Sequence, residues 1–163
     1  MLFRVSSLIA AGVILTGCIS MSHHQNPPQD TAQATHTGEH LVASTHSFDT
    51  TVQRLQSAID ARGLTTFAVI DHSKGAAGVG IDLSPLTLFI FGSPKAGAPL
   101  MQRNARMGLD LPMKMLVHEQ DGAVHIVYPD ITSIAASRGL DAAQMPVPKM
   151  AQTLSDIAAE ATR

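Results

Sequence analysis

The chain has 163 residues, of which 45% are hydrophobic and only 4% aromatic, it lacks Trp, and its formal net charge is −2. Such a chain offers neither a basic stripe for nucleic-acid phosphates nor an aromatic platform for single strands, so we expect no nucleic-acid partner. The length predicts one globular domain with enough apolar residues for a core.

The first predicted element is a short hydrophobic segment at residues 1–17. Arg4 precedes an apolar run, Leu8–Leu15, that is shorter than the roughly 20 residues needed to span a bilayer. This order is typical of a secretory signal peptide. The segment runs into Leu15-Thr16-Gly17-Cys18, which resembles the lipobox of bacterial lipoproteins.

The lipobox resemblance implies that the signal peptide is removed and that Cys18 is acylated. Two or more acyl chains hold a protein on a membrane stably, whereas one is marginal. The alternative is a plain secreted protein with a cysteine near its cleavage site by chance. Because Cys18 is the only cysteine, no internal disulfide can form. Ile19 replaces the Asp of an inner-membrane retention signal, so we expect the periplasmic side of the outer membrane.

Residues 18–40 are polar, contain a pair of prolines and show no apolar period, which predicts a flexible tether. The segment is rich in histidine. That composition suggests either a metal-binding tail or simply a solvated linker, which we favour because no cysteine or carboxylate pattern accompanies the histidines. These histidines are His23, His24, His36 and His40.

The domain is expected at residues 41–163. A short strand at 41–45 precedes a helix with Ser47 as its N-cap. A β-rich run at 65–71 follows, and the Gly-rich stretch at 75–80 predicts a loop or a short helical turn, because it lacks a complete phosphate-binding motif.

Three more strands are predicted in the middle of the domain. Residues 86–91 are apolar on both faces, which is typical of a strand buried from both sides. Residues 113–120 and 123–128 flank Asp121-Gly122, a strong β-hairpin signal.

Two helices are expected to end the domain. Asp130 is placed to cap a short helix that ends at Gly139, and an apolar stripe runs along a last helix from Pro146 to Ala161. The order of elements predicts an α+β fold in which helices pack on one face of a mostly antiparallel sheet.

Several short motifs between His46 and Leu140 are similar to those of one protein family. They are Ser47-Phe-Asp-Thr-Thr-Val-Gln-Arg-Leu55, Phe67-Ala-Val-Ile-Asp-His72, Phe91-Gly-Ser-Pro94, Gly97-Ala-Pro-Leu-Met101, Leu109-Asp-Leu-Pro112 and Tyr128. The chain thus resembles the bacterial and archaeal family named domain of unknown function 302. The resemblance implies the order strand, helix, four strands, helix, and it implies no function. Ser93 and Ala98 stand where that family usually has Asn and Thr.

The first candidate site starts from Asp71 and His72 at a strand end, where functional groups often collect. His72 could act as a base or a ligand near neutral pH, or it could simply tie the loop to the backbone. The motif turns after the strand at 86–91 are expected to close over it. The predicted pocket consists of Asp71, His72, Phe91, Gly92, Pro94, Lys95, Pro99, Met101 and Tyr128.

The second candidate is a pair of histidines. A two-residue turn at Asp121-Gly122 places His118 directly opposite His125, with Cβ atoms roughly 5 Å apart. Two imidazoles at this distance could share a metal or form a pH switch, or they could pack as flat rings on the sheet, which we favour.

Four methionines fall close together in the sequence. With the histidines they suggest a copper(I) site in an exported protein, whereas methionine more often fills gaps in a core, which we favour here. They are Met101, Met107, Met113 and Met115.

Three functions remain open. The first is a non-catalytic, membrane-anchored module that binds a small apolar ligand or a partner protein, including a second copy on an open sheet face. The second is periplasmic handling of copper or zinc. The third is a small enzyme using Asp71 and His72, which is least favoured because no Ser-His-Asp or Cys-His set can be assembled. No cofactor is expected.

Overall fold

The computed structural model describes residues 38–144 and 146–163, which belong to the compact unit Thr35–Arg163. Residues 1–37, with the predicted signal peptide, Cys18 and most of the tether, lie outside the described residues. The elements, in chain order, are β1 (Glu39–Ala43), α1 (Phe48–Asp60), β2 (Thr65–Asp71), α2 (His72–Ala77), β3 (Leu86–Gly92), α3 (Pro94–Arg103), the 3-10 helix η1 (Ala105–Leu109), β4 (Met113–Gln120), β5 (Ala123–Pro129), α4 (Ile131–Ser137) and α5 (Val147–Thr162).

The five strands form one sheet in the order β1-β5-β4-β3-β2, and every neighbouring pair is antiparallel. The predicted α+β class and the order strand, helix, four strands, helix are therefore confirmed. The chain inserts α2, α3 and η1 between strands, and of these only the segment of α2 was expected as a short helical turn. β1 begins at Glu39, so His40 belongs to the sheet and not to the tether.

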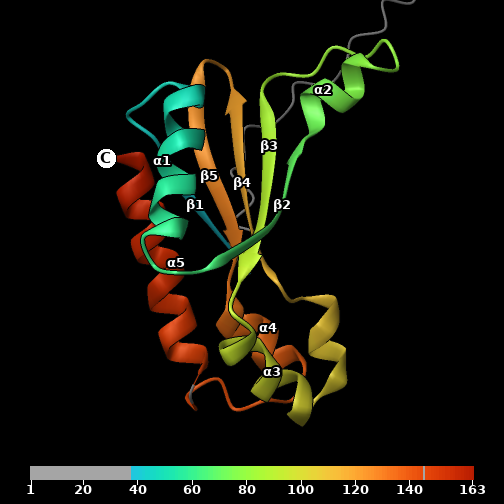
Figure 1. Cartoon of the computed structure of the whole chain (residues 1–163), viewed down its shortest axis with the longest axis vertical. Coiled ribbons are helices and arrows are strands. Elements are labelled where there is room, and N and C mark those ends of the chain that lie inside the picture. The colour runs from blue at the N-terminus through green and yellow to red at the C-terminus, as the bar shows by residue number, and fades with distance from the viewer. Residues whose placement is uncertain (1–37, 145) are drawn as a thin grey trace, which may run out of the picture. The chain divides into compact units, whose positions relative to one another are not determined.

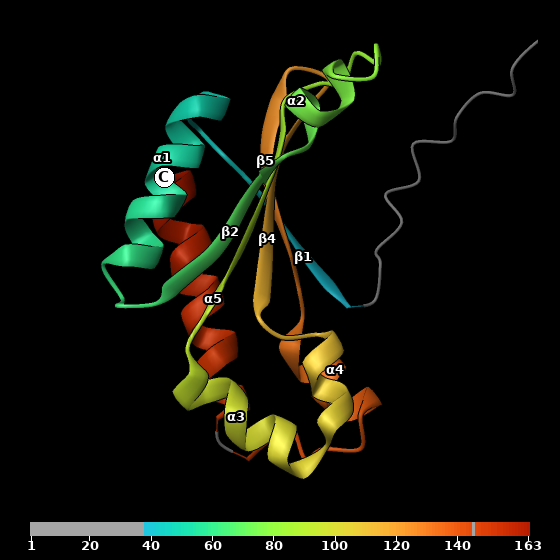
Figure 2. The same cartoon turned by 45° about the vertical axis from the view of Figure 1, so that its right-hand side comes forward.

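Helices α1 and α5 lie side by side on one face of the sheet (Figure 2). Local signals start α1 as predicted, because the Ser47 side chain accepts a hydrogen bond from the backbone N–H of Thr50. The covered face of the sheet is mostly apolar. Its buried side chains include Phe89, Phe91, Met113, Met115, Val117, Ile126 and Tyr128.

The opposite face of the sheet is only half-buried. Directly paired residues share a face, and one such row crosses all five strands with an aliphatic side chain on each: Ile70, Leu88, Leu116, Val127 and Leu41. We call this the open face. The prediction that the strand at 86–91 is buried from both sides is wrong for this chain by itself, because no described helix lies across this face (Figure 2).

The β4–β5 hairpin has the predicted two-residue turn. Asp121 and Gly122 both adopt positive φ angles, 53° and 76°, as the favoured hairpin turn requires. The turn pairs Gln120 with Ala123, and the predicted register from there to His118 opposite His125 is confirmed.

Candidate functional site

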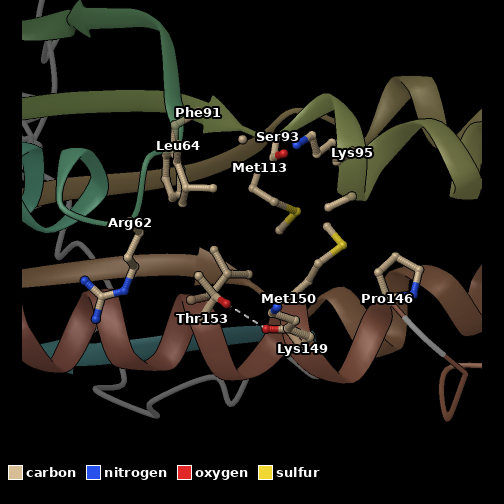
Figure 3. A pocket seen from close by; sticks show the side chains of 13 residues that line it. Arg62, Leu64, Phe91, Ser93, Lys95, Met113, Pro146, Lys149, Met150 and Thr153 are labelled. Carbon is tan, nitrogen blue, oxygen red and sulfur yellow. Dashed lines mark hydrogen bonds between the residues drawn. The ribbon is translucent and has the colours of Figure 1, made fainter.

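A cavity of about 550 Å³ lies where β3 ends, between the start of α3 and α5 (Figure 3). Its lining is mostly apolar. The lining residues are Arg62, Leu64, Phe91, Gly92, Ser93, Lys95, Ala96, Met113, Pro146, Lys149, Met150, Thr153 and Leu154. The volume is within the range of small-molecule sites, about 300–1,000 Å³.

A second cavity of about 250 Å³ has an almost entirely apolar lining and shares five residues with the first. Phe67, Pro94, Gly97, Met101, Leu111 and Pro112 complete its wall. The shared residues are Gly92, Ser93, Ala96, Met113 and Met150. We call the two hollows together the α3 cavities, since the first turn of α3 borders both.

Local sequence builds each wall. β3 turns its alternate side chains inward, so Phe91 belongs to the floor. Ser93 is extended, and Pro94 occupies the first position of α3, where its missing N–H costs nothing. On the opposite side, Met150, Thr153 and Leu154 follow the i, i+3, i+4 spacing that places side chains on one face of α5.

Three cations and no carboxylate line the larger cavity. Arg62 is engaged, because its guanidinium donates to Glu160 at 2.8 Å and to the carbonyl of Ala58 at 2.9 Å. Lys95 and Lys149 are exposed, and neither ammonium has a hydrogen-bond or ion-pair partner among the described residues. The cavity therefore combines an apolar interior with two free positive charges.

The structure brings together five residues of the predicted pocket. Phe91, Gly92 and Lys95 line the larger cavity, and Gly92, Pro94 and Met101 line the smaller one. The other members lie elsewhere. Pro99 is exposed within α3, and Tyr128 is buried in the core, where it stacks on His40 with ring centroids 4.8 Å apart.

Asp71 and His72 do not belong to this site. β2 runs antiparallel to β3, so Thr65 pairs with Gly92 while Asp71 pairs with Thr87. The prediction that the turns after β3 close over His72 is therefore wrong, because the two motifs lie at opposite ends of the sheet (Figure 1). The Asp71 carboxylate instead caps α2 by accepting from the backbone N–H of Lys74 at 2.8 Å, and His72 is exposed.

His118 and His125 stack on the open face with ring centroids 5.3 Å apart and an interplanar angle of 22°. Burial, and then the neighbouring His125, lower the pKa of His118 below its ordinary value. Within residues 38–144 and 146–163, no group of three His, Cys, Asp or Glu residues is arranged to hold a metal ion. The pair therefore has the flat-ring packing favoured from sequence.

The methionines divide between core and cavity. Met107, Met113 and Met115 are buried, as predicted for core residues. Met101 is 37% exposed and lines the smaller cavity, while Met113 also lines both cavities.

Sequence reasoning missed the α5 wall of the site. Lys149, Met150 and Thr153 lie more than fifty residues from the end of β3, and no local signal pairs these segments. Met150 belongs to the apolar stripe predicted for the last helix. Pro112 is the last residue of one of the family-like motifs. Neither feature by itself predicts a cavity, because the cavity exists only where α3 and α5 meet the sheet.

The model of one protein family matches residues 40–161, which is most of the domain just described. Its description is "Domain of unknown function DUF302". The chain belongs to the DUF302 family. The DUF302 fold is also found in an uncharacterized conserved protein from Bacillus stearothermophilus, with a TM-score of 0.69, 18% identity, and coverage of 77% of this chain and 98% of that one.

One part of the DUF302 chain is also similar to one part of several longer proteins. It is 38% identical over 100 residues to proteins named "Fluoride-specific ion channel FluC 1" from Brucella suis and "FluC 2" from Brucella melitensis. The match covers 61% of this chain but only 38% and 36% of those relatives. Among residues 38–144 and 146–163, no helix has both the length and the apolar character needed to cross a membrane.

Proposed function

We propose that this DUF302 chain is a membrane-anchored lipoprotein whose domain binds a small apolar ligand in the α3 cavities, without catalysing a reaction. The observation that carries the proposal is the larger cavity, about 550 Å³ with a mostly apolar lining. Preformed apolar cavities of this size with a few polar groups are the usual form of a small-molecule site.

The chemistry of the lining supports binding over catalysis. Ser93 and Thr153 carry the only hydroxyl groups among the lining residues, and none of those residues is His, Cys, Asp or Glu. The Thr153 hydroxyl already donates to the carbonyl of Lys149 at 2.8 Å. A wall of this composition offers apolar contact and orientation, but it lacks the acid–base pair that a hydrolytic or proton-transfer site would use.

A neutral apolar fluorophore, N-phenylnaphthylamine, tests this proposal in the full chain carrying Cys18→Ser. Ala96 lines both cavities, so Ala96→Phe fills shared space and should weaken binding at least about tenfold. Ala98→Phe, on an exposed position of the same helix that borders neither cavity, is the matched control. Equal fluorophore affinity in all three proteins, or none in any, would contradict the proposal.

The anchor is proposed from the Leu15–Cys18 motif alone. We expect the native chain to carry labelled fatty acid and to sediment with membranes, and Cys18→Ser to lose both properties. Ser20→Ala is the control, since it leaves the cysteine in place. A Cys18→Ser protein that keeps its lipid label in the membrane fraction would overturn the anchor.

A second candidate function is pairing with a second copy through the open face. The aliphatic row that crosses all five strands favours it, since Leu41 in that row is 61% exposed. Leu116→Glu at the centre of the row should then lower the sedimentation coefficient, whereas Val79→Glu, outside the row and already 75% exposed, should not. A wild-type chain that sediments as a monomer would contradict this candidate.

A further inference from the structure

Two lysines from different helices line the larger cavity. Lys95 lies in the first turn of α3 and Lys149 in the first turn of α5, and both line the cavity (Figure 3). We propose that the α3 cavities bind an anionic amphiphile, with its hydrocarbon body in the apolar interior and its carboxylate or phosphate head group between Lys95 and Lys149. This inference rests on the proposed apolar-ligand function and specifies the ligand class.

The charge at the cavity contrasts with that of the whole chain. The formal net charge of the chain is −2, yet the larger cavity is lined by three cations and no acid. Glu160 pairs with Arg62, which leaves Lys95 and Lys149 as the charges without a partner among the described residues. An anion between them would gain Coulomb energy from both, and more so where the apolar wall lowers the local dielectric.

Helix stability does not explain these two lysines. The first turn of a helix is the positive end of its dipole, where acidic residues are favourable and cations are not. Neither α3 nor α5 has an acidic residue in its first turn, and each has a lysine there. A bound anion would relieve both unfavourable placements at once, which is why the lysines point to a ligand more than to the fold.

A hydroxyl completes the polar rim. Ser93 lines both cavities, and its side chain makes no capping hydrogen bond to α3. A serine hydroxyl free of a capping role can donate to a carboxylate or phosphate oxygen beside the ammonium groups. The interior below this rim is formed by apolar side chains, among them Phe91, Met113 and Met150.

Displacement of N-phenylnaphthylamine by four ten-carbon amphiphiles tests the head group, again in the full chain carrying Cys18→Ser. The probes are decanoate, decyl phosphate, decanol and decyltrimethylammonium. We expect both anions to bind more tightly than decanol, and the cation to bind most weakly. The carboxylate and phosphate arms show which head group is preferred. Rising salt should weaken the anions but not decanol.

The double variant Lys95→Gln/Lys149→Gln removes both positive charges and keeps polar side chains of similar length. Its affinity for the preferred anion should fall about tenfold, because each partly exposed ion pair contributes only modestly to binding. Its affinity for decanol should not change. Lys74→Gln is the matched control, because Lys74 is exposed on α2 at the other end of the sheet. Unchanged decanol affinity in the double variant also shows that the cavity is intact.

The outcomes separate the two proposals. If decanol binds as tightly as the anions, or if the double variant binds the anions as wild type does, the anionic head group is wrong while the apolar site stands. If neither the fluorophore nor any amphiphile binds, the proposed function fails and this inference fails with it.

Discussion

The two ends of the sheet differ in what they offer a ligand. At the end where β3 leads into α3, apolar side chains from three strands, their adjoining loops and two helices surround the α3 cavities, with two lysines at the rim that have no partner among the described residues. At the other end lies α2 (Figure 1), which begins at His72. Strand pairing places His118 and His125 at this end too. No residue of α2 is buried.

This difference separates two of the three functions that the sequence left open, metal handling and apolar-ligand binding. Metal handling would need the histidine end, where the described residues supply a stacked pair and no third ligand. Apolar binding would need the α3 end, where a cavity is already formed. Residues of α3 and α5 line that cavity, whereas no residue of α2 lines either of the α3 cavities.

The largest expected effect comes from the floor of the α3 end. Phe91 is 1% exposed, so Phe91→Ala should lower the free energy of unfolding by about 3–5 kcal/mol. Ile70→Ala, on β2 near the α2 end and 39% exposed, should cost much less, because less apolar area is lost. Urea titrations of the two variants measure the contrast, and similar losses would show that the two ends are equally packed.

Two aspartates cap helices at opposite ends of the sheet, and their replacement by alanine should lower the free energy of unfolding by smaller, unequal amounts. Asp130 accepts from the backbone N–H of Thr132 at 2.9 Å and starts α4, which buries Ile131 and Ala135. Asp130→Ala should therefore cost about 1–2 kcal/mol. Asp71→Ala should cost less, since α2 buries no residue and can fray without exposing the core.

The pKa of Asp130 gives that comparison a pH test. Burial by itself would raise the pKa, but hydrogen bonds from Thr132 and Ser133 outweigh it and hold the pKa below its ordinary value. Asp130 thus stabilises the fold fully above the pKa that its carboxyl has in the unfolded chain. This stabilisation is lost as the pH falls through the lower pKa of the folded chain. The gap in unfolding free energy between wild type and Asp130→Ala should narrow at acid pH, and a constant gap would contradict this cause.

The histidine end should show its own pH dependence. Burial and His125 lower the pKa of His118 below 6.5, so the unfolded chain takes up the proton more readily than the folded one. The free energy of unfolding should therefore fall as pH drops below 6.5 towards the lowered pKa. His118→Gln should flatten this decline, as measured by thermal unfolding across that range. Exposed His72→Gln is the control, and an equal flattening there would refute the assignment.

The smallest expected effect is the binding of zinc by His118 and His125. Two stacked imidazoles without a third ligand should bind it no more tightly than about micromolar, because stable protein sites use three or four ligands. Isothermal titration of the full chain carrying Cys18→Ser measures this. Tight binding that disappears in His125→Ala would instead restore metal handling as a function of the histidine end.

Local signals in the sequence predicted the local structure. The Ser47 and Asp130 caps, the Asp121-Gly122 turn and the opposition of His118 to His125 are confirmed, because each depends on residues within a few positions of one another. The same local signals missed α3, whose Gly- and Pro-containing sequence has weak helical propensity and is helical where it packs on the core through Leu100.

The sequence by itself determined the α+β class, the five strands and five of the residues that line the α3 cavities. Only the tertiary structure decided that Asp71-His72 and the Gly92–Lys95 turn lie apart, because antiparallel pairing sends the end of β2 to the start of β3. It also decided that Lys149 and Met150 complete the site. Packing between distant segments depends on summed apolar burial, which no single motif records.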